Sequence, residues 1–237
     1  MEKFLVNYFA QMGIVLDDEK KNKLLKYYEM LVEKNKVMNL TAITEFEEVV
    51  IKHFADSISI IKAADLSLIG TVIDIGTGAG FPGMVLKIVF PELNITLLDS
   101  LNKRINFLTE VIEALNLDGI KTIHGRAEDF AHKKEYREKF DLCVSRAVAN
   151  LSTLSEYCMP FVKEKGNFIS YKAGDCSEEI SEAKNAIKTL GGSIKDTIDF
   201  VMPDTDIKRT FVVINKEKPT NIRFPRKAGV PSKEPLK

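Results

Sequence analysis

The feature that most constrains this chain is a glycine-rich run between residues 72 and 83, Val-Ile-Asp-Ile-Gly-Thr-Gly-Ala-Gly-Phe-Pro-Gly. An apolar stretch ends at Gly76, and a helix-like segment follows Gly83. Several glycines close together let the backbone turn tightly and approach a ligand where a Cβ would collide. A strand, a glycine turn and a helix N-terminus in this order predict a nucleotide site.

The hydrophobic pattern along the chain predicts an α/β fold. Up to about residue 66 the apolar residues recur at helical spacing, and there is no strand signal before residue 71. After that point strands and helices alternate, and the last two strands resemble an antiparallel pair. We therefore expect a doubly wound, Rossmann-like, seven-stranded and mostly parallel sheet with an N-terminal helical cap.

The pattern also gives element boundaries. Strands are expected at 71–75, 94–98, 120–124, 140–145, 167–171, 193–201 and 210–215. Helices are expected at about 45–63, 84–89, 102–115, 151–158 and 177–190. The predicted division is a helical cap at 1–66, a ligand-binding domain at 67–218 and a basic tail at 219–237.

Composition is that of an ordinary soluble protein, with 45% hydrophobic and 29% charged residues among 237. No apolar run approaches the roughly 20 residues of a membrane span. The three cysteines include no C-x-x-C pair, which predicts neither a metal site nor a disulfide framework, and Cys143 is expected in the core. We expect a cytoplasmic protein and, without a long exposed apolar stripe, a monomer.

The C-terminal segment is basic although the whole chain has a formal net charge of zero. Residues 208–237 contain nine Lys and Arg but only two Glu. Such a segment is either a phosphate-binding patch or a solvated tail. Within it, Phe224 lies between Arg223 and Arg226 and is either a stacking face or a core anchor.

The glycine run by itself fits two classes of ligand. Gly78-x-Gly80-x-x-Gly83 satisfies the dinucleotide fingerprint, whereas Gly76-x-Gly78-x-Gly80 is typical of S-adenosylmethionine-dependent methyltransferases. Asp99 ends the second strand and can accept hydrogen bonds from ribose hydroxyls in either case. The acid therefore predicts an adenosine-type ligand without deciding which one.

Three further features favour the methyl donor. Asp74 precedes the first glycine, which suits a cationic aminoacyl group, and the expected terminal hairpin is typical of the methyltransferase sheet. Ala127 and Glu128 follow the third strand, where a small residue and a carboxylate can flank an adenine ring and its amino group. Glu128 and Asp129 are alternatively a pair of acids that stabilises a helix N-terminus.

Five segments carry a resemblance to a known family: 35–43, 74–83, 97–104, 145–149 and 224–236. They resemble the bacterial small-subunit ribosomal RNA guanine-N7 methyltransferases, also called glucose-inhibited division protein B, and the match spans essentially the whole chain. The glycine run is shared by many methyltransferases, but the first and last segments are not. One departure is Lys34, which stands where the family usually has Trp.

The resemblance implies S-adenosylmethionine as cofactor and N7 of one guanine in small-subunit (16S) ribosomal RNA as acceptor, either in naked RNA or in the assembled subunit. The cofactor residues that it implies are Gly76, Phe81, Ala127, Glu128 and Arg146. The sequence motifs add Asp74, Gly78 and Asp99.

Guanine N7 has a free lone pair, so its methylation needs no general base and depends on positioning. Candidates that position the acceptor are Arg146 and Lys172 at strand ends, and Asn39 and His53 in the cap. The structural alternatives are an ion pair within the fold for Arg146, a helix-surface or capping histidine for His53 and a chain turn at Asn39. The basic residues Arg226, Lys227 and Lys233 are expected to bind phosphate without base specificity.

Two other functional classes remain open at this stage. One is a small-molecule methyltransferase or an NAD-dependent oxidoreductase on the same sheet. The other is a non-enzymatic regulatory protein that retains a nucleotide pocket, since a fold does not determine a function.

Overall fold

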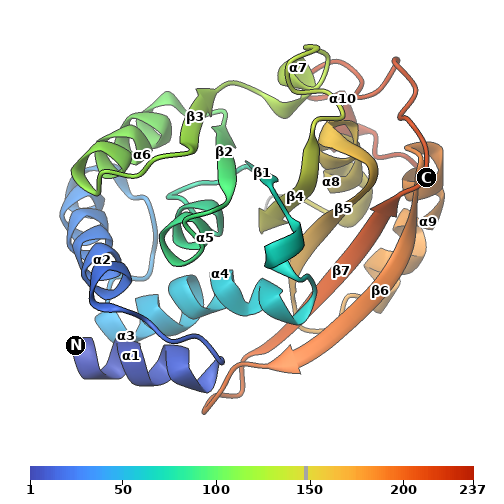
Figure 1. The fold of residues 1–237 in the computed structure, drawn as a ribbon. Helices are drawn as coiled ribbons and strands as arrows, with labels where there is room; N and C mark the ends of the chain where they lie inside the picture. Colours follow the sequence, from blue (N-terminus) through green and yellow to red (C-terminus); the bar gives the residue numbers. More distant parts are fainter. Residues whose placement is uncertain (147–148) are drawn as a thin grey trace.

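The computed structural model describes residues 1–146 and 149–237, so Ala147 and Val148 of the 145–149 segment lie outside the described residues. Its centre is a seven-stranded sheet of order β3-β2-β1-β4-β5-β7-β6, with helices on both faces (Figure 1). Neighbouring strands from β3 to β5 pair in parallel, and β7 runs antiparallel to both of its neighbours. The predicted doubly wound sheet with one reversed strand is confirmed, and its switch point lies between β1 and β4.

The strand boundaries agree closely with the apolar runs. The strands are β1 (Thr71–Ile75), β2 (Asn94–Asp99), β3 (Ile120–His124), β4 (Phe140–Arg146), β5 (Val162–Ala173), β6 (Gly192–Val201) and β7 (Lys208–Lys216). The largest difference is β5, which begins at Val162 rather than at 167. Residues 163–166 are Lys-Glu-Lys-Gly and show no apolar alternation, so the pairing of Val162 with Phe140 extends the strand without a sequence signal.

Most helices also lie where they are expected. Those predicted with bounds are α5 (Gly83–Val89), α6 (Asn102–Ala114), α8 (Leu151–Cys158) and α9 (Ser177–Thr189), and the region predicted only as a helical cap contains α1 (Glu2–Gln11) and α2 (Asp18–Met38). Two helices of four residues each, α7 (Ala127–Phe130) and α10 (Val230–Lys233), are absent from the predicted bounds, and only α7 was expected as an alternative, from the acids Glu128 and Asp129. One helical turn is too short to show a 3.6-residue period.

The helix predicted at about 45–63 is present as a continuous helical segment at 46–62, but it is not a regular α-helix. The segment consists of α3 (Phe46–Val49), a π-helical turn (Val50–Ala55), α4 (Asp56–Ile58) and a 3₁₀ turn (Ser59–Lys62), and a further 3₁₀ turn follows at Leu66–Leu68. A π-helical turn widens the helix and redirects the side chains that follow, which the apolar pattern does not report. This turn carries His53, and α4 begins at Asp56.

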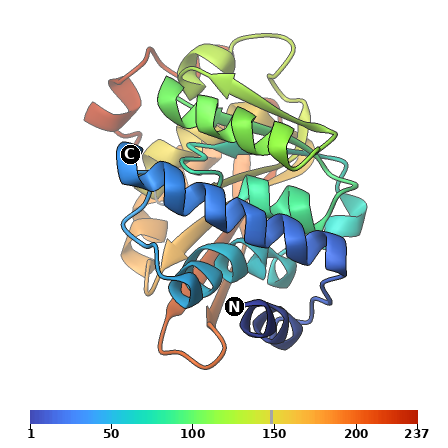
Figure 2. The ribbon, with the colours of Figure 1, turned by 90° about the vertical axis from the view of Figure 1, so that its left-hand side faces the viewer.

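The helical cap packs against the sheet through α2. Tyr27 is fully buried, its hydroxyl donates to the carbonyl of Ala79 in the glycine run, and its ring centroid lies 5.6 Å from those of Phe54 and Phe81. Figure 2 shows α2 running between α6 and the 46–62 segment. A Cβ at Gly80 would lie 2.6 Å from the Tyr27 hydroxyl oxygen, so this close approach requires glycine. The predicted domain boundary at residue 66 stays a prediction. The hydrophobic core around Tyr27 contains residues from both the predicted cap and the predicted ligand-binding domain.

Two further observations concern the whole of the described chain. None of its helices combines the length and apolarity needed to cross a bilayer, and no group of three or more His, Cys, Asp or Glu side chains is placed to hold a metal ion within residues 1–146 and 149–237. Cys143 is fully buried, as predicted.

Candidate active site

A cleft of about 570 Å³ lies at the carboxyl ends of β1 to β4. Doubly wound sheets bind their ligands at this edge, beside the switch point. The structure brings together eight of the residues selected from sequence in the wall of this cleft: His53, Gly76, Gly78, Phe81, Asp99, Ala127, Glu128 and Arg146. Segments that are far apart in the chain therefore converge on one site.

Asp99 and the glycine turn are joined by backbone hydrogen bonds. The N–H of Gly78 donates to Asp99 Oδ2 at 2.9 Å, and the N–H of Leu101 donates to Oδ1 at 2.9 Å. Arg104 Nη1 lies 3.3 Å from Oδ2. Gly78 has a φ of +63°, which favours glycine at this point of the turn. The carboxylate is thus held at the strand end, where the predicted ribose contact requires it.

Asp74 lies beneath the glycine turn and is not part of the cleft wall. Its Oδ2 accepts hydrogen bonds from Thr77 Oγ1 at 2.7 Å and from the N–H of Gly83 at 2.9 Å. Its Oδ1 is buried and has no donor among the described residues. Burial raises the pKa of this carboxyl to about 6, with the two hydrogen bonds acting in the opposite direction. An interaction with a cationic ligand would therefore act through charge from below the turn.

His53 is stacked on Phe81 at the other side of the turn. The two ring centroids are 4.5 Å apart with an interplanar angle of 19°, and Arg146 Cζ lies 5.2 Å from the centroid of Phe81. His53 Nε2 is 2.9 Å from Thr41 Oγ1. Burial, assisted by the charge of Arg146, lowers the pKa of His53 to about 4. The imidazole is consequently neutral at neutral pH.

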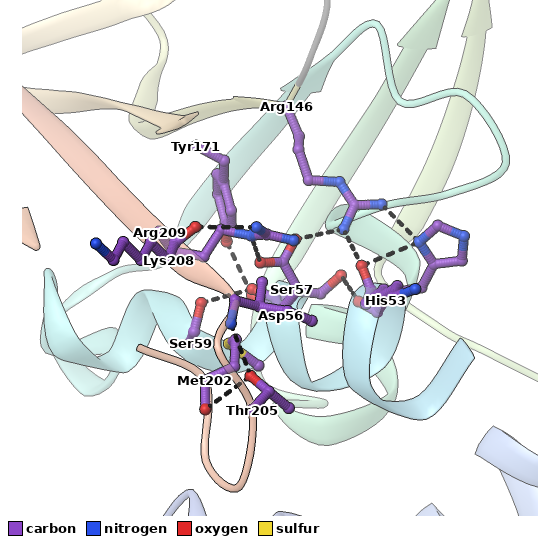
Figure 3. A network of polar contacts seen from close by, with 12 residues as sticks. His53, Asp56, Ser57, Ser59, Arg146, Tyr171, Met202, Thr205, Lys208 and Arg209 are labelled. Atoms are coloured by element: carbon purple, nitrogen blue, oxygen red, sulfur yellow. Dashed lines mark hydrogen bonds and ion pairs between the residues drawn. The ribbon is translucent and has the colours of Figure 1, made fainter. Parts of the chain in front are cut away.

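The carboxylate of Asp56 bridges the guanidinium groups of Arg146 and Arg209 (Figure 3). Its buried carboxylate accepts from Arg146 Nη1 at 2.7 Å and from Arg209 Nε at 2.6 Å. Nearby, the Tyr171 hydroxyl donates to the carbonyl of Ser57 at 2.8 Å, which ties α4 to β5. Both arginines are partly exposed, so two guanidinium groups on one carboxylate leave net positive charge beside the cleft. Arg146 thus both makes an ion pair within the fold and lines the cleft.

The opposite end of the cleft is formed by α7. Ala127 and Glu128 are buried there, and Glu128 Oε1 accepts a hydrogen bond from the N–H of Gly229 at 3.0 Å. Glu128 also lies in the first turn of α7, as the alternative interpretation expected, so the two are compatible. Tyr157 and Ser232 line the same cleft.

Sequence reasoning missed several of these residues. Asp56 and Arg209 complete the polar network, and Tyr157 and Ser232 add to the cleft wall. Of these only Ser232 falls within a segment of the family match, and nothing there indicated the cleft.

Comparison with known proteins agrees with this geometry. The sequence profile of the GidB family, described as rRNA small subunit methyltransferase G, matches residues 20–207. The chain belongs to this family. Two curated relatives named Ribosomal RNA small subunit methyltransferase G, from Lachnoclostridium phytofermentans and Acetivibrio thermocellus, are each 51% identical to it. The alignments cover 95% and 100% of this chain and 93% and 97% of the relatives.

Solved structures that resemble this member of the rRNA small subunit methyltransferase G family share its fold. Pyrococcus horikoshii TYW2 in complex with MeSAdo has a TM-score of 0.53 at 12% identity, over 68% of this chain and 61% of that one. M. jannaschii TYW2 in complex with AdoMet has a TM-score of 0.51 at 14% identity, over 68% of this chain and 76% of that one. At such identities the likeness supports the Rossmann-like class I methyltransferase fold alone.

Two of the four residues predicted to position the acceptor in this GidB family member lie outside the cleft wall. Lys172 Nζ contacts Glu179 Oε1 at 2.6 Å and the carbonyl of Ala149 at 3.2 Å. Asn39 caps the C-terminus of α2 with a φ of +49°, which is the turn alternative. The next two residues, Leu40 and Thr41, line the cleft instead. Roles for Lys172 and Asn39 in the reaction stay predictions.

The basic tail of the chain is packed against the fold. Phe224 is buried in a hydrophobic cluster, which agrees with the core-anchor alternative. Arg226 makes a bidentate contact with the fully buried Glu156, whereas Lys227 and Lys233 are exposed. The three residues predicted to bind phosphate therefore differ, because the charge of Arg226 already has a partner inside the protein. Their binding to phosphate stays a prediction.

Proposed function

We propose that this protein transfers the methyl group of S-adenosylmethionine to N7 of a guanine in small-subunit ribosomal RNA. Support comes from its family, from the names of its relatives and from fold neighbours solved with MeSAdo and AdoMet. The observation that carries the proposal is the composition of the cleft. It combines a glycine turn, the strand-end carboxylate of Asp99 and the carboxylate of Glu128 in α7, which suit an adenosine-type cofactor, with a polar network around Arg146.

The residues of the cleft fit the cofactor. We infer that Asp99 accepts hydrogen bonds from ribose hydroxyls and that Glu128, beside Ala127, accepts from the adenine amino group. Gly76 and Gly78 let the backbone approach the ligand, and Phe81 forms an apolar wall. Asp74 adds negative charge beneath the turn, opposite in sign to the ligand's cationic aminoacyl group. When bound, the cofactor supplies an electrophilic methyl group on a cationic sulfur.

The acceptor chemistry needs positioning more than proton transfer. Guanine N7 has a lone pair in the ring plane and loses no proton before it attacks a methyl carbon. A neutral His53 suits this reaction, because positive charge develops on the purine as the bond forms. The charge of Arg146 is partly compensated by Asp56, so it can donate to a base edge without strongly opposing that development.

We assign the acceptor side of the cleft to His53 and Arg146. The family resemblance also implies Arg146 as a cofactor residue, and we favour the acceptor side because its guanidinium group contacts Asp56 and His53. Lys172 and Asn39 lie outside the cleft wall, and we infer a supporting role for them. A guanine must leave its stack to enter the cleft, and stacking on aromatic rings commonly holds such a base. Lys227 and Lys233 are exposed and can contact RNA phosphates without reading sequence.

The test is methyl transfer with purified protein. Small-subunit RNA from cells that lack the protein is incubated with labelled S-adenosylmethionine, once as naked RNA and once as assembled subunits, and the product is digested and identified. We expect label in N7-methylguanosine in one of the two arms, and much less with Asp99→Ala. Label in another base, or no label in either arm, would contradict the proposal.

A further inference from the structure

The segment 224–234 reaches the cleft from the C-terminal end of the chain. Figure 1 shows α10 beside α7 and close to α8. Ser232 lines the cleft together with Tyr157 of α8. The N–H of Gly229 donates to Glu128, the residue assigned above to the adenine end. The positive charge of this segment predicts RNA binding, but the segment lies next to the cofactor side of the site.

A buried ion pair fastens this segment. Glu156 of α8 is fully buried, and its carboxylate accepts from Arg226 Nε at 2.9 Å and from Nη2 at 2.6 Å. The main-chain N–H of Arg226 donates to the same carboxylate at 2.8 Å. The planar guanidinium group matches both carboxylate oxygens at once, which the single ammonium of a lysine cannot do.

Two more contacts hold the segment on either side of this pair. Phe224 is buried in the core, and Arg137 Nη1 donates to its carbonyl at 2.9 Å. Further along, Thr153 Oγ1 of α8 donates to the carbonyl of Pro231 at 3.0 Å, and Thr153 is itself buried. The segment is thus attached at several points before it enters the cleft wall at Ser232.

We propose that residues 224–234 form a wall of the cofactor cleft and that Arg226 is a positioning residue, which acts through Glu156, and not a phosphate contact. Among the described residues, the N–H of Gly229 is the one hydrogen-bond donor to the Glu128 carboxylate. It orients one oxygen and leaves the other for the amino group of an adenosine ligand. The inference rests on the proposed function, because it assigns that ligand to this cleft.

The test measures the affinity for S-adenosylhomocysteine by calorimetry in full-length variants. Arg226→Lys keeps the charge but loses the bidentate contact, and we expect binding about tenfold weaker. Ser232→Phe adds a ring at an exposed position of the cleft wall, and we expect a similar loss with an unchanged melting temperature. Lys218→Ala removes an exposed charge outside the cleft wall, and we expect no change. The losses should be the same at about 50 mM and about 200 mM salt, unlike those of an RNA phosphate contact.

The possible outcomes separate this inference from the proposed function. If both Arg226→Lys and Ser232→Phe bind S-adenosylhomocysteine with wild-type affinity, the inference that residues 224–234 form a wall of the cofactor cleft is wrong. If Arg226→Lys does not fold, Ser232→Phe decides alone. If Arg226→Gln, which removes the charge, binds S-adenosylhomocysteine with wild-type affinity but binds ribosomal RNA with a smaller salt dependence, Arg226 is a phosphate contact and the inference is wrong. Absence of binding to the unaltered protein would contradict the proposed function itself, and the inference with it.

Discussion

The two sides of the cleft are held together by different kinds of contact. The cofactor side, by which we mean the turn 76–83 with Asp99, depends on backbone N–H groups that donate to carboxylates. The acceptor side, by which we mean His53, Asp56, Arg146 and Arg209, depends on contacts between side chains. The contacts of the cofactor side form within a short stretch of chain and the neighbouring strand. The contacts of the acceptor side form only when the cap, β4 and β7 are packed together.

This difference has a consequence for mutation. A backbone turn can tolerate the loss of one hydrogen bond while its glycines keep their conformation. In the acceptor side one carboxylate serves two guanidinium groups, so its loss affects both arginines together, and the effects of single changes there should not add. The two sides meet at Phe81, because His53 of the cap stacks on its ring and Arg146 of β4 lies 5.2 Å from the same ring centroid.

The largest effect is expected for Asp56→Asn. Arg146 would lose its charged partner beside the reacting base, and we expect the single-turnover rate of methyl transfer to fall about 100-fold. Because one member of a buried ion pair is removed, the free energy of unfolding in urea should fall by about 3 kcal/mol. Glu110→Gln, which breaks an exposed pair with Lys34, is the control and should change neither quantity appreciably. A normal rate in Asp56→Asn would show that the network is only structural.

Asp99→Ala should produce the next largest effect, on the other side of the cleft. The variant loses both the inferred ribose contact and the partner of Gly78, so we expect the affinity for S-adenosylhomocysteine to fall about 30-fold by calorimetry. Asp118→Ala removes an exposed acid outside the cleft wall and controls for the lost charge. Unchanged affinity in Asp99→Ala would remove Asp99 from the cofactor site.

A smaller effect concerns Asp74 and pH. Its pKa is raised to about 6 in the free protein, and a nearby cationic ligand favours the ionised form. Binding below this pKa therefore releases a proton, and the affinity for S-adenosylhomocysteine should be about tenfold lower at pH 5 than at pH 7. Asp74→Asn should flatten this dependence. An equally steep dependence in the variant would assign the titration to another group.

How much of the site could be predicted from sequence follows the same division. The strands, the glycine turn and Asp99 were predictable because their signals are local runs of residues. Asp56 was not, because its partners Arg146 and Arg209 are 90 and 153 residues away and it lies in a segment that resembles an ordinary amphipathic helix. Net charge also could not show that Arg226 pairs with a buried carboxylate whereas Lys227 is exposed, because both residues carry the same charge.

The smallest effect is expected for His53. Its pKa is lowered to about 4, so it stays neutral above pH 5 and the rate of methyl transfer should show no inflection near 6.5 that belongs to this residue. His53→Gln loses the stack on Phe81, and we expect a rate about fivefold lower with an unchanged pH profile between pH 6 and 8. An inflection that is present in the unaltered protein and absent in the variant would show that the imidazole titrates during the reaction.

The division of the cleft into two sides is tested most directly by measuring both quantities in the same two variants. Calorimetry gives the affinity for S-adenosylhomocysteine, and single-turnover transfer to ribosomal RNA at saturating cofactor gives the rate. We expect Asp99→Ala to lose affinity while its rate at saturation largely recovers, and Asp56→Asn to keep its affinity while its rate is lost. If Asp56→Asn loses cofactor affinity as strongly as Asp99→Ala, Arg146 serves the cofactor and the separation of the two sides is wrong.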